Sequence, residues 1–96
     1  MGATTFSQTG KGKTAKEAFF TAHAEARYAH GHAGYSGTLA EKDSFVEITP
    51  PEGADPRAFA SDLLDNDDPR VSDKWGPAGC VKVAPDTYMF FGWASC

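Results

Sequence analysis

The start of one helix constrains the fold of this chain more than any other feature of its sequence. Thr14 and Glu17 have the spacing of a capping box, in which each side chain accepts a backbone amide hydrogen of the first helical turn. Small and apolar residues then recur at helical spacing, at Ala15, Ala18, Phe19, Ala22, Ala26 and Ala29. Gly31 follows, a residue type that readily takes the positive φ of a helix end. We therefore expect a helix from Thr14 to His30 whose alanine face packs closely against a sheet.

The segments around this helix predict strands and one further helix. β-Branched and aromatic residues predict strands at 3–9, 44–49, 79–84 and 87–93. Pro85-Asp86 supplies a turn between the last two strands, which predicts a hairpin. Pro56 suits the first turn of a second helix, which begins at Asp55 or Pro56 and ends in the acidic run before Pro69.

This order of elements, β-α-β-α-β-β, predicts a single α+β domain over residues 1–96. A chain of this length holds one modest core, and seven Phe, three Tyr and two Trp supply aromatic packing material. The expected architecture places both helices on one face of a small, mostly antiparallel sheet.

Composition argues against a membrane protein. The chain has no long apolar run, and residues 1–6 lack the charged and apolar regions of a signal peptide. We expect a cytoplasmic protein in which Cys80 and Cys96 are reduced. A disulfide between them would require the last strand to return beside Cys80.

Charge is distributed unevenly along the chain. The net charge is −4, and residues 41–74 hold ten acidic against four basic residues. No basic patch of the nucleic-acid-binding kind is present, so we expect no nucleic-acid partner. The acidic run that contains Asp65, Asp67 and Asp68 is a candidate surface for a protein partner, and a solvated face is the simpler alternative.

The residues after the first helix combine histidines with evenly spaced glycines. His30 and His32 could both contribute to a metal site, although zinc sites need three or four protein ligands. Cationic histidines at a helix C-terminus also complement the helix dipole, without any metal. Ser36 beside a histidine has the residue types of a nucleophilic site, but the spacing of a nucleophile elbow is missing. We expect no resident cofactor.

The last strand carries aromatic residues on both faces. Alternation places Tyr88 and Phe90 on one face, and Phe91 and Trp93 on the other. One face packs on the helices. The other is either covered by a further element or available to a partner or a second copy.

The segment from Gly31 to Val46, with the opening Gly2-Ala3-Thr4-Thr5-Phe6, resembles small uncharacterised proteins of bacteriophages and bacterial mobile elements. This resemblance implies a protein that binds and blocks a host protein, including proteins of host defence. It implies no catalytic residues.

The sequence therefore favours a non-enzymatic protein-binding module, and the resemblance narrows this to an inhibitor of a host protein. Tyrosine is a frequent interface anchor, which directs attention to Tyr35. The candidate partner-binding residues are His32, Tyr35, Ser36, Asp65, Asp67, Asp68 and Trp93. Two alternatives stay open: a small metal-dependent or hydrolytic enzyme centred on His30 and His32, and a self-associating structural protein that forms a homodimer through the C-terminal strand.

Overall fold

Four strands and two helices follow one another in the expected order β-α-β-α-β-β. The computed structural model describes residues 3–30, 39, 42–73 and 76–95. The elements are β1 (Ala3–Lys11), α1 (Ala15–His30), β2 (Phe45–Glu47), α2 (Pro56–Asp65), β3 (Ala78–Ala84) and β4 (Thr87–Ser95). The expected α+β class is confirmed, and the element boundaries agree to within a few residues.

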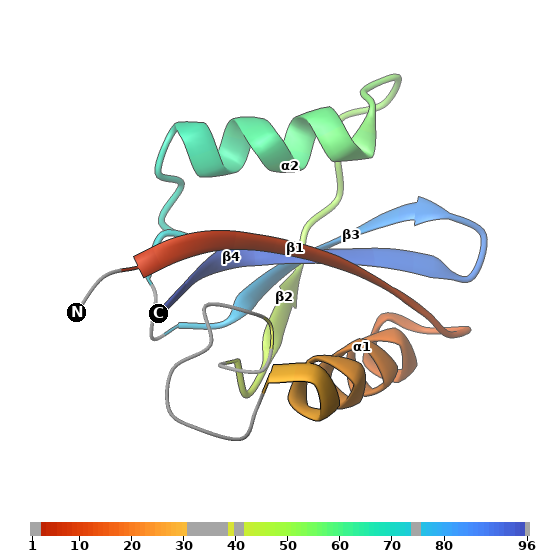
Figure 1. Cartoon of the computed structure of the whole chain (residues 1–96). Helices are drawn as coiled ribbons and strands as arrows, with labels where there is room; N and C mark the ends of the chain where they lie inside the picture. Colours follow the sequence, from red (N-terminus) through yellow and green to blue (C-terminus); the bar gives the residue numbers. More distant parts are fainter. Residues whose placement is uncertain (1–2, 31–38, 40–41, 74–75, 96) are drawn as a thin grey trace.

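The strands form one sheet in the order β1-β4-β3-β2. β4 lies inside the sheet, antiparallel to β1 on one side and to β3 on the other, while the short β2 runs parallel to β3. The expectation of a mostly antiparallel sheet is confirmed. The first and last strands are neighbours, so Ala3 at the start of β1 lies opposite Ser95 at the end of β4 (Figure 1).

The turn between β3 and β4 forms where the sequence predicted it. Asp86 has a positive φ of 54°, a conformation that aspartate tolerates better than most residues. The Asp86 carbonyl also accepts the Gly12 amide hydrogen at 3.0 Å. This bond ties the connection between β1 and α1 to the hairpin turn.

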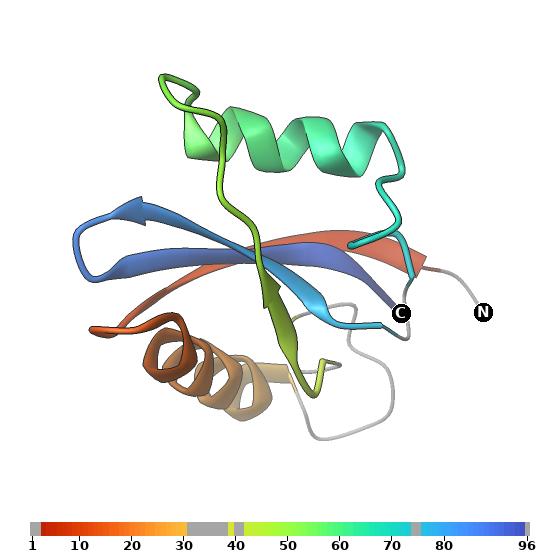
Figure 2. The same cartoon turned by 180° about the vertical axis from the view of Figure 1, so that it is seen from behind.

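The two helices lie on opposite faces of the sheet, as Figures 1 and 2 show. Tyr88 and Phe90 of β4 share a buried cluster with the alanines of α1. Met89 and Phe91, which alternate with them, share a second cluster with Ala60 and Leu63 of α2. The expectation of both helices on one face is therefore wrong. The physical reason is that β4 is apolar on both faces, and each apolar face must be covered.

α1 approaches β1 closely, as its alanine face predicted. A Cβ atom added at Gly10 would lie 2.5 Å from the Ala18 carbonyl oxygen and 2.8 Å from the Ala22 Cβ. The Gln8 side-chain amide donates to the Ala22 carbonyl at 2.9 Å. Glycine on the strand and alanine on the helix are thus matched, since any larger side chain on either would separate the two backbones.

Side chains define the start of each helix. The Thr14 hydroxyl accepts the Glu17 amide hydrogen at 3.2 Å, as expected. A capping box predicts that Glu17 accepts the amide hydrogen of Thr14, but its carboxylate accepts the Lys13 amide hydrogen at 2.9 Å instead. Asp55 caps α2 by accepting the Arg57 amide hydrogen at 3.3 Å, with Pro56 in the first turn.

Candidate functional site

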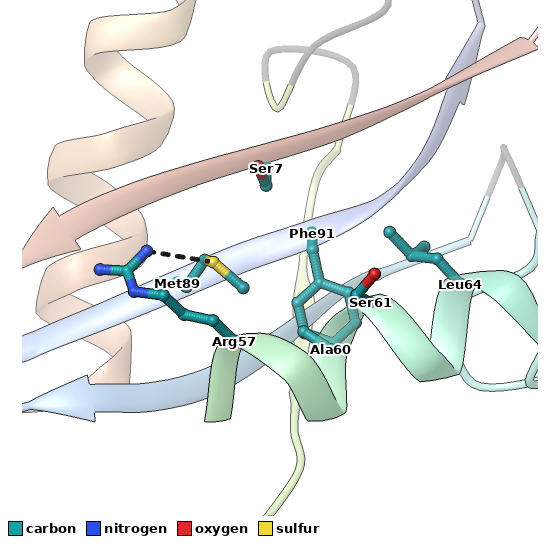
Figure 3. A pocket seen from close by; sticks show the side chains of 7 residues that line it. All are labelled: Ser7, Arg57, Ala60, Ser61, Leu64, Met89 and Phe91. Atoms are coloured by element: carbon teal, nitrogen blue, oxygen red, sulfur yellow. Dashed lines mark hydrogen bonds between the residues drawn. The ribbon is translucent and has the colours of Figure 1, made fainter. Parts of the chain in front are cut away.

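A groove runs between α2 and the neighbouring face of β1 (Figure 3). It forms because α2 packs over β3 and β4, whereas the side chains of β1 that face the same way stay exposed. The groove has a volume of about 320 Å³. Its lining residues are Ser7, Arg57, Ala60, Ser61, Leu64, Met89 and Phe91.

The floor of the groove is apolar and its rim is polar. Met89 and Phe91 of β4 form the floor and are 7% and 0% exposed. Ser7 lies opposite Phe91 in the register of β1 and β4. Ser7 and Ser61 place hydroxyl groups at the rim. An apolar floor with a few polar groups around it is the usual composition of a binding site.

Arg57 lies at one end of the groove and reaches across Met89. Its Nη1 atom donates to the Met89 sulfur at 3.7 Å, and sulfur is a weak acceptor. An ion pair joins Arg70 to Asp68, and no carboxylate of the described residues pairs with Arg57. The guanidinium therefore keeps donors available for a ligand.

β1 is an edge strand nine residues long. β4 pairs with one side of it along its whole length, and no strand in the described ranges pairs with the other. β4 itself has neighbours on both sides from Thr87 to Phe91. The long free edge of the sheet thus belongs to β1, not to the C-terminal strand that the homodimer hypothesis used.

The acidic candidates lie at the C-terminal end of α2. Asp65 is the last helical residue and is exposed, and Asp67 has a positive φ of 51°. Asp68 forms an ion pair with Arg70 at 2.9 Å. Hydrogen bonds from the Arg70 side chain and backbone lower the pKa of Asp68 to about 2. Asp68 is thus already engaged within the chain, whereas Asp65 faces solvent.

Trp93 lies near the end of β4, opposite Thr5 of β1. The side chain is partly buried, and its indole N–H has no acceptor among the described residues. Phe91, its neighbour in the predicted aromatic face, is covered by α2. The second aromatic face is therefore largely core, with Trp93 at its margin.

The other candidates lie outside the described residues. These are His32, Tyr35, Ser36 and Cys96, together with the side chain of His30. Within residues 3–30, 39, 42–73 and 76–95, no three His, Cys, Asp or Glu side chains gather as metal ligands would. In the same ranges no helix has the length and apolar character needed to cross a membrane.

Sequence reasoning missed both Arg57 and the groove. The signal was present in α2, where Arg57, Ser61 and Leu64 follow helical spacing and so share one face. That face lines a groove only because α2 packs on the side of the sheet away from α1. A buried lysine, Lys42, was missed as well: its exposed fraction is 1%.

Cys80 is a buried free thiol on the α1 side of the sheet. Burial, with a smaller contribution from the negative charge of Glu47, raises its pKa to about 12 from the ordinary value of 9.0. The thiolate is the reactive form of cysteine, so this residue is a poor nucleophile. A catalytic role for Cys80 is thereby disfavoured.

We expect Cys80 to make the protein less stable at alkaline pH. The unfolded thiol loses its proton above pH 9, whereas the folded thiol keeps it up to about pH 12. In that window the folded state holds more protons, so the free energy of unfolding falls by about 1.4 kcal/mol per pH unit. Between pH 8 and pH 10.5, urea denaturation should show wild type losing about 2 kcal/mol relative to Cys80→Ala. Parallel pH profiles for the two proteins would contradict the raised pKa.

The chain matches no protein-family model, no curated protein and no solved structure. A proposal for its function therefore rests on the geometry of the described residues. That geometry defines an α+β domain with one helix on each face of its sheet, a long free strand edge and a groove beside that edge.

Proposed function

We propose that this chain is a protein-binding module that takes an extended segment of a partner protein along the free edge of β1. The observation that carries the proposal is the position of the groove: Ser7 of the edge strand is part of its lining. A segment paired with β1 would run directly beside the groove, at the side away from β4.

The edge of β1 has the properties of a pairing surface. Its unpaired N–H and C=O groups form a template for a further strand. Natural edge strands are commonly protected by proline, by bulges or by repeated lysines. β1 contains no proline, its register with β4 is continuous, and its one lysine is the terminal residue, Lys11. Nothing in β1 itself therefore opposes the addition of a strand.

The groove would add specificity to this pairing. Main-chain hydrogen bonds supply affinity for any extended segment, whereas pockets beside the edge select particular side chains. Every second side chain of the added strand would point to the α2 side of the sheet. The groove has an apolar floor of Met89 and Phe91. It therefore favours a segment with an apolar residue among the side chains that point to the α2 side. On the strength of the sequence resemblance alone, we expect the partner among proteins of a bacterial host.

Selection from a displayed library of random peptides tests this function. We expect the selected peptides to bind in solution and to slow hydrogen exchange at backbone amides of β1. Ser7→Arg, which fills the groove from the edge strand, should weaken binding at least tenfold. Thr21→Arg is the matched control, because Thr21 is exposed on α1 at the other face of the sheet.

Two results would overturn the proposal. The first is protection from exchange confined to elements other than β1. The second is equal affinity of the wild type and Ser7→Arg for peptides that Thr21→Arg also binds.

A further inference from the structure

We propose that the segment bound beside β1 carries an acidic residue followed, two positions later, by a large apolar residue. The acidic side chain pairs with Arg57, and the apolar side chain enters the groove above Phe91. This inference rests on the proposed function, because it assumes an extended segment paired with the edge of β1.

The charge of the partner follows from Arg57. A guanidinium has five N–H donors in a planar fork that matches a carboxylate. At Arg57 one of them meets only the weak sulfur acceptor of Met89, and no carboxylate of the described residues pairs with the group. This is notable because residues 41–74 hold ten acidic against four basic residues. An unpaired cation at the end of an apolar groove selects an anionic group.

Lys11 adds positive charge at the same end of the groove. Strand alternation places its side chain on the same face of β1 as Ser7. Its register partner is Thr87, two residues along β4 from Met89, which Arg57 contacts. A carboxylate there would therefore meet two cations, from α2 and from the edge strand.

The spacing of the two side chains follows from the groove floor. Met89 marks the position of Arg57, and Phe91 forms the apolar floor two residues further along β4. Residues two apart in any strand lie on one face, about 6.6 Å apart. An added strand presents its own side chains with the same repeat, so the acidic and apolar residues are separated by one position.

The order of the two residues follows from the register of β1. Thr9 lies opposite Met89, and Ser7 lies opposite Phe91. A segment antiparallel to β1 passes Thr9 before it reaches Ser7. Antiparallel pairing is slightly more stable per residue than parallel pairing. The acidic residue therefore comes first, which gives the pattern acidic-x-apolar.

The groove is large enough to take a large apolar side chain. Its volume of about 320 Å³ lies at the small end of the range for ligand pockets, roughly 300 to 1,000 Å³. Ala60 and Leu64 of α2 provide its apolar wall. The absence of a bulky side chain at position 60 leaves room above Phe91, which suits leucine, methionine or phenylalanine from the partner.

Three labelled nine-residue peptides test this pattern by fluorescence anisotropy. They share a threonine-rich sequence and carry Glu-x-Leu, Lys-x-Leu or Glu-x-Ser at their centre. We expect Glu-x-Leu to bind at least tenfold more tightly than either of the others. We also expect its advantage over Lys-x-Leu to shrink as salt is added, because salt screens exposed charges.

Charge reversal at Arg57 gives the sharper test. Arg57→Glu should lose the preference for Glu-x-Leu over Lys-x-Leu, and the double variant Arg57→Glu with Lys11→Glu should reverse it. Arg27→Glu makes the same change in net charge as Arg57→Glu, but on α1 at the opposite face of the sheet, and should keep the wild-type preference. Circular dichroism of all three variants confirms that they are folded. A wild-type preference in Arg57→Glu, or a reversed preference in Arg27→Glu, would overturn the inference.

The outcomes separate this inference from the proposed function. Equal binding of all three peptides, with β1 protected from hydrogen exchange, would refute the acidic-x-apolar pattern and leave the edge-binding function standing. Binding of no peptide, or protection confined to other elements, would refute both. A dimer in solution whose β1 amides are protected from hydrogen exchange without any peptide would show that a second copy occupies the edge instead, and would refute both.

Discussion

We expect Phe90→Ala to lower the free energy of unfolding by about 4 kcal/mol, the usual cost of removing a fully buried aromatic ring. Phe90 is 0% exposed in the central strand of the sheet. Its ring contacts the rings of Phe19 and Phe45 edge-on, with centroids 5.4 and 5.7 Å away. It thereby joins α1 and β2 to β4. Urea denaturation followed by circular dichroism measures the loss.

Phe20→Ala is the matched control for this prediction. Phe20 neighbours Phe19 on α1 but is 77% exposed, so its removal should change stability by no more than about 0.5 kcal/mol. Phe90→Leu keeps part of the buried volume and should fall between the two. If the alanine variants at Phe90 and Phe20 lost similar stability, the ring cluster would not be the centre of this core.

The elements of the fold were predictable because their signals are local. Thr14 and Pro56 mark the helix starts, and Pro85-Asp86 marks the hairpin turn, each through its own backbone chemistry. The alanine face of α1 also predicted a close approach to the sheet, which Gly10 permits. Each of these signals acts over a few residues, so no knowledge of the partner elements was needed.

The placement of the helices was not predictable from such signals. The period of α2 shows which face of the helix is apolar, but it does not show which side of the sheet that face covers. The aromatic residues on both faces of β4 were the relevant observation, and they left two alternatives open. The structure decides between them, since α2 covers Phe91.

The groove exists because α2 lies on that face of the sheet, so the sequence alone did not predict it. Asp65, Asp67 and Asp68 are close together in the sequence, whereas the groove joins residues from β1, α2 and β4. Arg57 is a single cation within an acidic stretch and has no motif around it. We propose a role for it because no carboxylate of the described residues pairs with it, and this is a property of the folded chain.

We expect Lys42→Ala to lower the free energy of unfolding by about 4 kcal/mol. Lys42 is 1% exposed, and its ammonium group donates to the carbonyl oxygens of Asp73 and Gly76 at 3.2 and 2.9 Å. Alanine would leave a cavity in place of the methylene chain. It would also remove a donor from two carbonyl groups, at about 1 kcal/mol or more each. Urea denaturation measures the loss.

A second substitution separates packing from hydrogen bonding at this site. Lys42→Met keeps most of the apolar volume and removes the donor, so we expect it to lose about 2 kcal/mol. Lys16→Ala, at an exposed position of α1, should stay within about 0.5 kcal/mol of wild type. A loss in Lys42→Ala no greater than in Lys16→Ala would show that the ammonium group is not held as described.

The pH dependence of the Lys42 variants gives an independent test. Burial lowers the pKa of Lys42 from 10.5, and the charge of Asp73 only partly opposes this effect. Between the folded pKa and 10.5 the unfolded state binds more protons, so the contribution of Lys42 to stability rises with pH. The deficit of Lys42→Met relative to wild type should therefore grow as pH rises through that window. Cys80 acts in the opposite direction above pH 9, but both proteins retain it, so its contribution cancels in their difference. A deficit that shrinks with pH would mean that the folded protein raises the pKa of Lys42.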